Sequence, residues 1–489
     1  MEKGQIVTID IVDMSNEGKG IGKIEGLAIF VDGVVIGDKI TAEITKVKKN
    51  YCFAKLVEIN KPSIYRVASA CEYSKECGGC TLAELTYDAQ LAWKEKMILD
   101  RLTRLGGLEN PVINPIIGAD QQFRYRNKAQ MPISGGGLIT RKGGLQENVG
   151  SIAIGFYKAK SHSVVNCRKC LLQSEASEAV ADAVRKFMKQ DNILAYDPKW
   201  EKGLFRHLIV KTAMNTGEVM AIIAINGKAI PNGEKMVAMI DAAINDLPPR
   251  ADGVEYSLES VAVNVNKKKT PEIMGEECII IAGKPTILEK VGKLQFEISP
   301  HSFYQVNPAQ MNKLYKKAAE YAGLTGTETV LDLYCGVGTI GIFCAESAKR
   351  VIGIESVKSA VLDANRNATI NGAVNAEFIC GKVEEVLPKL LNGYEGKDGE
   401  MVAPIKPDVV ILDPPRSGCY PNLLEEVAKA EPKKIIYVSC DPATLARDIK
   451  ILGELGYEFV EGTPVDMFPQ TVHVETIILM TRSGSGDKK

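Results

Sequence analysis

The C-terminal half of the chain contains acidic and thiol side chains at the ends of short apolar runs that are typical of buried strands. Asp413 follows VVIL, Cys440 follows KIIYVS, and a further apolar run begins at Glu475. The carboxyl ends of parallel strands meet at one edge of a sheet, so the pattern predicts one rim with five such groups: Asp332, Glu355, Asp413, Cys440 and Glu475. A thiol among these groups could act as a nucleophile, which suits covalent catalysis.

Cys440 is followed directly by Asp441 and Pro442, a pair that is typical of a helix start. The positive end of that helix would favour the thiolate, which is the nucleophilic form of cysteine. The alternative is a buried strand cysteine without a chemical role, and the residues around Cys440 alone leave both interpretations open.

A glycine-rich turn lies within residues 330–342, VLDLYCGVGTIGI. The apolar start predicts a buried parallel strand, the glycines permit a tight turn, and the remainder can continue as a helix. About 20 residues later the run RVIGIE ends in Glu355, where a carboxylate can accept both hydroxyls of a ribose. The pattern predicts the first turn of a Rossmann-like sheet with a nucleotide-like ligand, although such turns also occur where they only pack a helix onto a strand.

Three cysteines, Cys71, Cys77 and Cys80, lie within ten residues and enclose two glycines. Thiolates at this spacing suit a soft metal or an iron-sulfur cluster, and a fourth ligand is then required. Cys167 and Cys170 in NCRKC are the candidates for that ligand. Zinc and inert buried cysteines are the alternatives.

The composition indicates a multidomain protein. The 489 residues exceed one ordinary core, and domains of about 100 to 200 residues predict three units. No apolar stretch approaches the roughly 20 residues that cross a bilayer, and the N-terminus lacks a signal-peptide pattern, so we expect a cytoplasmic protein without a membrane partner. Twelve cysteines in a reducing compartment favour metal, cluster or catalytic roles over disulfides. The net charge of -1 does not exclude a nucleic-acid partner.

Residues 1–60 alternate apolar and polar positions in short runs that are separated by glycine turns. This pattern predicts a small antiparallel β-barrel of five strands. Such barrels commonly contact RNA, and the alternative is a barrel that only packs on its neighbour. Lys46, Lys48 and Lys49 form its only basic group.

Residues 61–290 are predicted to form a mixed α+β central domain that carries the cysteines. Helical periodicity over residues 87–105 predicts a packing helix, and the region 87–110 is expected to lie against the catalytic domain. In FRYRNK, alternation along a strand would place Arg124, Arg126 and Lys128 on one face. That face suits phosphate contacts, although an exposed polar strand would have the same pattern.

Residues 291–482 are predicted to form an α/β catalytic domain, and residues 483–489 a flexible tail. Asn307 and Pro308 indicate a helix start, and Gln305 lies just before it. Pro414 and Pro415 are expected to keep the loop after Asp413 rigid at the carboxyl edge of the sheet.

Together these motifs resemble the RNA 5-methyluridine methyltransferase family, in particular the ribosomal RNA (uracil-5-)-methyltransferases. The resemblance covers residues 1–482 and rests on CEYSKECGGC, SFYQVN, DLYCGVGTIG, LDPPRSG, YVSCDPATLARD and HVETIILM. It implies a multidomain protein with three parts. These are a TRAM barrel of the oligonucleotide-binding (OB) type, an iron-sulfur central domain, and a Rossmann-like class I methyltransferase domain that uses S-adenosyl-L-methionine.

The resemblance also implies residue roles. Cys440 corresponds to the nucleophile, and Glu475 to the base that removes the proton from carbon 5 of uracil. The donor-binding positions correspond to Gln305, Tyr334, Glu355 and Asp413. A 4Fe-4S cluster would be held by Cys71, Cys77, Cys80 and Cys170, where Cys170 fits better than Cys167 because the apolar LLQ follows it.

The implied function is methylation of carbon 5 of a uridine in 23S ribosomal RNA by a monomeric enzyme. The alternatives are a transfer RNA 5-methyluridine methyltransferase, and an RNA-binding or redox-sensing iron-sulfur protein with an inactive methyltransferase domain. A cytosine-C5 methyltransferase would carry a cysteine where this chain has Arg416, and an amino methyltransferase would show NPPY or DPPY. Radical chemistry on S-adenosylmethionine is disfavoured, because its CxxxCxxC spacing differs from that of Cys71, Cys77 and Cys80.

Overall fold

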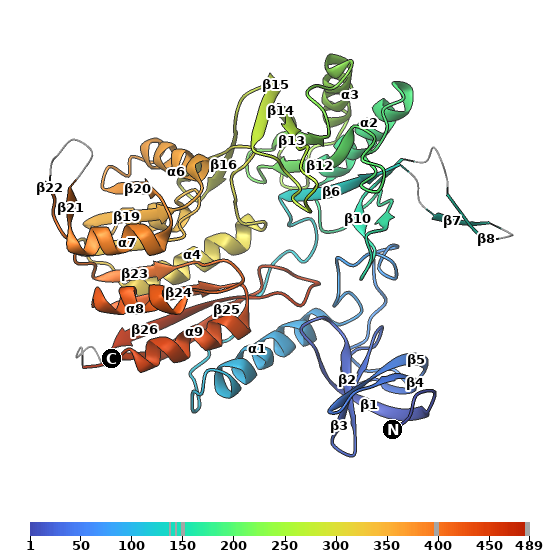
Figure 1. The fold of residues 1–489 in the computed structure, drawn as a ribbon, viewed down its shortest axis with the longest axis horizontal. Helices are drawn as coiled ribbons and strands as arrows, with labels where there is room; N and C mark the ends of the chain where they lie inside the picture. The colour runs from blue at the N-terminus through green and yellow to red at the C-terminus, as the bar shows by residue number, and fades with distance from the viewer. Residues whose placement is uncertain (136–137, 142–143, 148–151, 396–400, 485–489) are drawn as a thin grey trace.

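The N-terminal segment forms a closed five-stranded barrel with the order β1-β2-β3-β5-β4 (Figure 1). The computed structural model describes residues 1–135, 138–141, 144–147, 152–395 and 401–484. Alternate side chains of the strands, such as Ile9 and Ile11, fill the barrel core. The strands are β1 (Ile6–Met14), β2 (Gly20–Ile24), β3 (Leu27–Val31), β4 (Lys39–Val47) and β5 (Tyr51–Lys61).

The prediction of a five-stranded barrel is confirmed, but the prediction that it is entirely antiparallel is wrong. β3 and β5 pair in parallel. β4 lies between them in the sequence and runs back along the barrel, so β3 and β5 point in the same direction. This parallel pairing closes the barrel and leaves it without a free edge.

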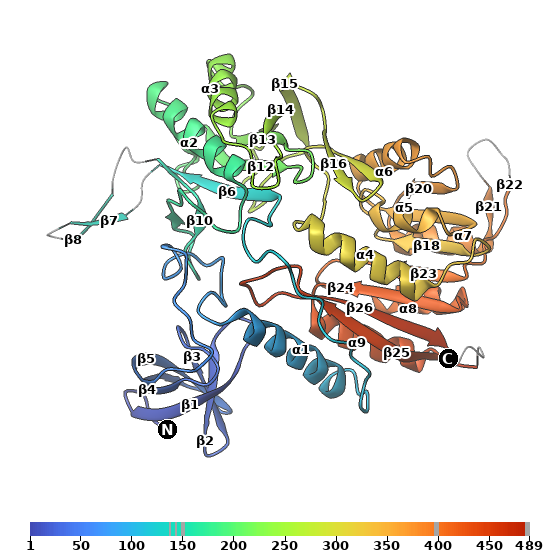
Figure 2. The same ribbon diagram turned by 180° about the vertical axis from the view of Figure 1, so that it is seen from behind.

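Helix α1 (Tyr87–Arg104) lies between the barrel and the C-terminal sheet (Figures 1 and 2). Its bounds agree with the predicted helix over residues 87–105. Ile98 and Leu102 join the apolar core that also contains α9 (Pro442–Glu454), and Trp93 packs with apolar residues of the barrel segment. The helix therefore connects two parts of the chain that have separate sheets.

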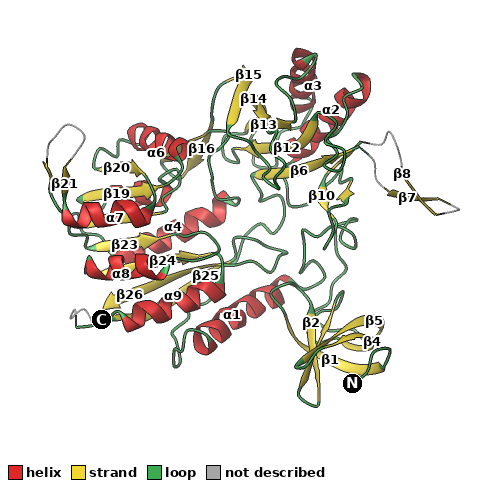
Figure 3. Ribbon diagram, in the orientation of Figure 1, coloured by secondary structure: helices red, strands yellow, loops and turns green. Residues whose placement is uncertain are grey.

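The central part of the chain forms a six-stranded sheet with the order β15-β14-β13-β12-β6-β9 (Figure 3). β13 and β14 pair in parallel, and the other neighbouring strands of this sheet pair antiparallel. The sheet is therefore largely antiparallel. Helices α2 (Glu175–Gln190) and α3 (Gly233–Asn245) pack on one face. The strands are β6 (Lys128–Ser134), β9 (Ala153–Ile154), β12 (Phe205–Thr212), β13 (Glu218–Ile225), β14 (Ser257–Val265) and β15 (Glu277–Gly283).

In the described part of the chain, four two-stranded sheets accompany the larger ones, and each pairs antiparallel. They are β7 (Leu138–Arg141) with β8 (Gly144–Glu147), β10 (Phe156–Tyr157) with β11 (Val164–Val165), β16 (Ile287–Val291) with β17 (Leu294–Ile298), and β21 (Tyr394–Glu395) with β22 (Met401–Val402). The third of these connects the central sheet to the C-terminal part of the chain.

The predicted basic strand over residues 123–128 is wrong, because β6 begins only at Lys128. Arg124 has a left-handed backbone conformation (φ 54°), and its guanidinium donates to the carbonyl oxygens of Cys170 (2.9 Å) and Gln173 (2.7 Å). Arg126 lines a cavity among the cysteines. The three basic side chains therefore share no strand face, and Arg124 supports the cysteine loop instead of forming part of an exposed phosphate-binding surface.

The C-terminal part forms a seven-stranded Rossmann-like sheet with the order β20-β19-β18-β23-β24-β26-β25. The first five strands are parallel, and β26 runs antiparallel to both of its neighbours. The strand order reverses between β18 and β23, and open α/β sheets bind ligands at such a switch point. The strands are β18 (Thr329–Leu333), β19 (Arg350–Glu355), β20 (Ala376–Cys380), β23 (Val409–Leu412), β24 (Lys434–Ser439), β25 (Tyr457–Val465) and β26 (Glu475–Arg482).

Successive residues of each strand point to opposite faces of this sheet, so both faces are apolar. Helices cover both of them. Leu331 and Leu333 of β18 belong to one core, and Val330 belongs to the other. The first core contains residues of α7 (Val383–Asn392), α8 (Pro421–Lys429) and α9, and the second contains residues of α4 (Pro308–Ala322), α5 (Thr339–Ala345) and α6 (Lys358–Ile370).

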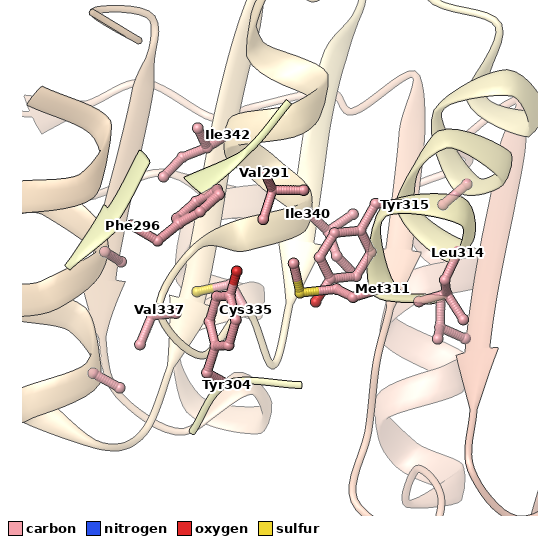
Figure 4. Packing of buried hydrophobic residues seen from close by; sticks show 14 of the residues in the cluster. Val291, Phe296, Tyr304, Met311, Leu314, Tyr315, Cys335, Val337, Ile340 and Ile342 are labelled. Carbon is pink, nitrogen blue, oxygen red and sulfur yellow. The ribbon is translucent and has the colours of Figure 1, made fainter. Parts of the chain in front are cut away.

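The core on the α4 side continues into the central sheet. Figure 4 shows Phe296 of β17 and Tyr304 in the same cluster as Met311 and Tyr315 of α4. Ile209 of β12 belongs to that cluster as well. The segment SFYQVN, residues 302–307, is therefore anchored where the two sheets share one core.

The C-terminus leaves the sheet after β26. The backbone N–H of Ser483 still donates to the carbonyl oxygen of Gly456 (2.9 Å). Of the predicted tail, residues 485–489 lie outside the described part of the chain. Within the described ranges, no helix combines the length and the apolar character needed to cross a bilayer.

Replacing Lys94 with methionine should lower the free energy of unfolding by roughly 3–5 kcal/mol in urea denaturation. The ammonium group of Lys94 pairs with the carboxylate of Asp466, and both side chains are fully buried, so the variant leaves a buried negative charge. Lys96→Met on the same helix is the control: its partners Asp13 and Asp100 are solvent-accessible, and the loss should stay below about 1 kcal/mol. Equal losses in the two variants would contradict this reading of the buried pair.

Candidate active site

Hydrogen bonds to the neighbouring strand hold the glycine-rich turn after β18. Tyr334 has a left-handed backbone (φ 64°), a strained conformation for a non-glycine residue. Its N–H donates to the carbonyl of Ile354 (3.0 Å), and the N–H of Gly336 donates to the carboxylate of Glu355 (3.2 Å). The turn and Glu355, which the sequence analysis connected only by spacing, therefore form one hydrogen-bonded unit at the switch point.

Asp332 does not reach the rim, and this part of the prediction is wrong. It precedes the last residue of β18 and is fully buried, because alternation turns its side chain toward α5. Its carboxylate accepts from the N–H of Gly341 in that helix (2.8 Å), and burial raises the pKa of Asp332 to about 7. A Cβ at Gly341 would lie only 2.9 Å from this carboxylate, so the glycine permits the close contact. Asp332 thus supports the turn from below.

The segment that carries Gln305 is fixed from three directions. Asn127 donates its side-chain amide to the carbonyl of Gln305 (2.9 Å), and its backbone N–H donates to Val306 (2.9 Å). Asn307 begins α4 as predicted, with its side chain accepting from the N–H of Gln310 (3.3 Å) and donating to the carbonyl of Met467 (3.2 Å). Gln305 itself is buried. Its assignment to donor binding stays a prediction.

The thiol of Cys440 and the carboxyl group of Glu475 come together through strand register. Ser439 at the end of β24 pairs with Thr476 of the antiparallel β26. The next residue on each strand in that direction is Cys440 on one and Glu475 on the other. Asp413 follows β23, the other neighbour of β24, and its N–H donates to the carbonyl of Leu333 (3.3 Å). Three of the predicted rim groups therefore lie near one another.

Burial dominates the electrostatics of these groups. It raises the pKa of Asp413 to about 7, and it raises the pKa of Glu475 well above the usual range, with the charge of Asp413 adding to the effect. The pKa of Cys440 is raised to about 12, first by burial and then by the negative charge of Glu475. Glu475 and Cys440 therefore favour their protonated forms in the free protein, whereas Asp413 titrates near neutral pH.

The prediction that a helix N-terminus favours the Cys440 thiolate in the free protein is wrong. α9 does begin at Pro442, but the side chain of Asp441 caps it and accepts from the N–H groups of Ala443 (2.9 Å) and Thr444 (3.1 Å). A carboxylate therefore already occupies the positive end of the helix. Burial and the neighbouring acids then determine the pKa of the thiol.

Sequence reasoning assigned no role to Arg416 or His473, although both lie inside the motifs LDPPRSG and HVETIILM. The positive charge of Arg416 opposes the raised pKa of Cys440 and of Glu475. It also contributes, after burial, to a pKa of about 4 for His473. Their place within two motifs that carry predicted catalytic residues is the signal that could have identified them.

Five cysteines from two distant segments line one cavity. Its volume is about 70 Å³, several times the roughly 10–15 Å³ that one water molecule needs. The thiols are those of Cys71, Cys77, Cys80, Cys167 and Cys170. Among the residues that the structure describes, no three histidine, cysteine or acidic side chains form a group that could hold a single metal ion.

Cys167 and Cys170 differ in their surroundings. The thiol of Cys167 hydrogen-bonds to the sulfur of Cys170, which lowers the pKa of Cys170 to about 6, and the backbone N–H groups of Leu172 and Gln173 contribute to the same effect. The pKa of Cys167 is raised by the same bond and by burial. Burial also raises the pKa values of Cys71, Cys77 and Cys80.

Asp332→Asn should change how stability depends on pH in the protein without methyl donor. Between pH 5 and 7 the folded wild type keeps the proton on Asp332, whereas the unfolded chain has already lost it, so wild-type stability falls as the pH rises. Asparagine does not titrate. The free energy of unfolding of the variant relative to wild type should therefore increase by roughly 2 kcal/mol across this window in urea denaturation. Parallel pH profiles would contradict the raised pKa.

Family models match both ends of the chain. Residues 1–57 match the TRAM domain, and residues 284–483 match the tRNA (Uracil-5-)-methyltransferase family. An uncharacterized RNA methyltransferase of Clostridium tetani is 41% identical over 489 residues, which covers 100% of this chain and 98% of the relative. Another from Caldanaerobacter subterraneus subsp. tengcongensis is 43% identical over 479 residues, with 98% of each chain covered.

A solved structure extends the similarity to three dimensions. The tRNA (uracil-54, C5)-methyltransferase of Pyrococcus abyssi, in complex with S-adenosyl-L-homocysteine, is 28% identical and superimposes with a TM-score of 0.71 over 97% of this chain and 100% of that one. The barrel, the Rossmann-like sheet and the full-length relatives agree with one another. This chain belongs to the family of RNA (uracil-5-)-methyltransferases that carry an N-terminal TRAM domain.

Proposed function

We propose that this protein acts in the cytoplasm as a monomer and transfers a methyl group from S-adenosyl-L-methionine to carbon 5 of a uridine in 23S ribosomal RNA. The observation that carries the proposal is the position of Cys440 opposite Glu475 on neighbouring strands. A nucleophile and a proton acceptor side by side suit addition to a pyrimidine ring followed by removal of a ring proton.

Four side chains near the glycine turn would bind the methyl donor: Gln305, Tyr334, Glu355 and Asp413. Glu355 would accept the ribose hydroxyls, as an acid at this strand position commonly does. Asp413 would face the positively charged sulfonium group. The raised pKa values of Asp413 and Glu475 support a cationic ligand, because a nearby positive charge lowers the pKa of a carboxyl group and offsets the cost of its burial.

In the proposed reaction, the thiolate of Cys440 forms a bond to carbon 6 of uracil, because carbon 5 alone is a weak nucleophile. Carbon 5 of the resulting enolate attacks the methyl group of the donor, the bond from the methyl carbon to the sulfonium sulfur breaks, and S-adenosyl-L-homocysteine leaves. Glu475 then accepts the proton from carbon 5, the double bond between carbons 5 and 6 forms again, and the bond from carbon 6 to sulfur breaks to release Cys440 as a thiolate.

Cys440 and Glu475 must both be ionised when they act, and burial opposes this in the free protein. Arg416 favours the charged form of both groups. The cationic donor would add a second positive charge at the same rim. We infer that the thiol is activated only once the donor is bound, which protects it from unrelated electrophiles.

The barrel offers a surface for single-stranded RNA. Phe30, Tyr51 and Phe53 form a cluster with ring centroids 5.5–5.7 Å apart, and the ammonium of Lys19 lies 5.3 Å from the centre of the Phe53 ring. Partly exposed aromatic rings beside cations stack RNA bases without regard to sequence. Such a surface would hold flanking nucleotides while the target base leaves its stack to reach the rim.

We propose 23S ribosomal RNA as the substrate because the sequence motifs resemble those of the ribosomal RNA (uracil-5-)-methyltransferases. Transfer RNA is the second candidate, because the Pyrococcus abyssi enzyme is named for uracil 54 of transfer RNA. Both RNAs present uridines in loops, where a base can be displaced at low cost.

A 4Fe-4S cluster would be held by Cys71, Cys77, Cys80 and Cys170. Support comes from the cavity that these thiols line, which has room for several atoms. The backbone N–H groups at Leu172 and Gln173 favour Cys170 as the fourth ligand. Methyl transfer moves no net electron, so we assign the cluster a structural role.

Incubation with labelled methyl donor should yield 5-methyluridine in unmodified 23S ribosomal RNA and not in transfer RNA. Cys440→Ala should lose this activity by at least about 10³-fold, since the variant lacks the thiol that would add to carbon 6. Cys278→Ala, which alters another half-buried cysteine, is the control and should keep it. Product in transfer RNA alone would establish the second candidate, and intact donor binding without any product would favour an RNA-binding protein with an inactive methyltransferase domain.

Protein purified without oxygen should contain iron and sulfide, and Cys170→Ser should lose both, whereas Cys167→Ser should retain most of them. The two residues lie three positions apart and line the same cavity, which makes them a matched pair. Iron and sulfide content with the visible absorbance spectrum would measure the difference. Loss of iron and sulfide in Cys167→Ser alone would show that Cys167 is the fourth ligand. Zinc without sulfide would show that the site holds a metal ion and not a cluster.

A further inference from the structure

The loop that precedes Glu475 is buried along most of its length. It comprises residues 466–474, connects β25 to β26, and is called the base loop below. Met467, Gln470, Thr471 and Val474 are each at most 5% exposed. Gln470 also adopts a left-handed backbone conformation (φ 70°), which a non-glycine residue keeps only where its neighbours enforce it. The surroundings of the base loop therefore determine its shape.

Helix α1 holds the base loop through two side chains. The side-chain amides of Gln90 and Gln470 are within hydrogen-bond distance (3.2 Å), and the N–H of Gln470 donates back to the oxygen of the Gln90 amide (3.0 Å). Lys94 donates to the carbonyl of Phe468 (3.2 Å) in addition to its pairing with Asp466. Gln90 is fully buried, so no water can replace its bonds.

The cysteine segment holds the same loop from the other side. Directly after Cys80, the hydroxyl oxygen of Thr81 accepts from the N–H of Val472 (3.1 Å), and the N–H of Leu82 donates to the carbonyl of Gln470 (3.0 Å). Gln470 itself lines the cavity of the thiols. The segment that forms the wall of that cavity is thus hydrogen-bonded to the base loop at Val472, three residues before Glu475.

We propose that Thr81 and Gln90 are positioning residues for the carboxylate of Glu475 and act on it through the base loop. Glu475 is the first residue of β26, so the direction in which the base loop enters the strand determines where its side chain lies. A general base must come within about 3 Å of the proton that it removes, and a displacement near 1 Å costs about 100-fold in rate. This inference rests on the proposed role of Glu475 as the base.

The step that such a displacement would slow is specific. The bond from Cys440 to carbon 6 forms and the methyl group is transferred before Glu475 acts. Only then does the bond between carbon 5 and hydrogen break, with the proton going to Glu475, its electron pair forming the double bond to carbon 6, and the bond from carbon 6 to sulfur breaking. A misplaced Glu475 should therefore leave methylated RNA attached to Cys440.

The test compares Thr81→Val and Gln90→Leu with wild type under single turnover and steady state. Valine keeps the shape of threonine but cannot accept from Val472. Each variant should lower kcat by about 10- to 100-fold, leave both KM values within about twofold, and accumulate a denaturation-stable complex of protein and methylated RNA. Thr369→Val on α6 removes a comparable hydroxyl contact with the backbone and should behave as wild type.

Glu475→Gln tests the proposed role of the base separately from the positioning role, because this variant should accumulate the same complex. If it does not, the proposed role of Glu475 fails. If Glu475→Gln accumulates the complex but Thr81→Val turns over like wild type, or loses activity through a raised KM without trapped RNA, the positioning role is refuted. Gln90→Leu alone could be impaired by misfolding, so Thr81→Val, with a melting temperature near that of wild type, decides the outcome.

Discussion

The hydrogen-bonded register between β24 and β26 is the constraint on which the arrangement of the rim depends. Ser439 pairs with Thr476, and this pairing brings Cys440 and Glu475 opposite each other at the strand ends. Side chains alternate along a strand, so a slip by one residue would turn one of the two groups to the opposite face. The parallel pairing of β24 with β23 then brings Asp413 to the same edge. The rest of the molecule holds the loops that leave this edge.

The exclusion of water determines the electrostatics of this edge. Apolar cores on both faces of the sheet exclude water, and burial therefore raises the pKa values of Asp413, Glu475 and Cys440 at its carboxyl edge. A buried carboxyl group of this kind becomes charged more readily when a cation binds beside it. Burial also raises the pKa of Asp332, but this carboxylate is enclosed beneath the turn that it supports and does not face a ligand.

Short-range patterns predicted most of the elements and the residues at their ends. Apolar runs followed by polar residues gave β18, β19, β23 and β24 in the correct order, and Asn307 and Asp441 proved to be helix caps. Long-range contacts caused the failures. Arg124 turns inward because the cysteine loop offers carbonyl groups to its guanidinium, and Asp332 is buried by a helix that packs over it. The pKa of the Cys440 thiol is raised by burial and then by Glu475 on another strand. No local pattern in the sequence carries information about such neighbours.

The contacts between the cysteine segment and the base loop also constrain the order in which the chain can fold. Gln90 and Gln470 are 380 positions apart, and Thr81 and Val472 are 391 positions apart. The barrel closes through contacts within its own 61 residues and can form early during synthesis, whereas the cysteine segment must wait until almost the whole chain has left the ribosome. During that interval the cavity of the thiols lacks only Gln470 from its wall. The link between the cysteine segment and the base loop is therefore completed only after nearly the whole chain has been synthesised.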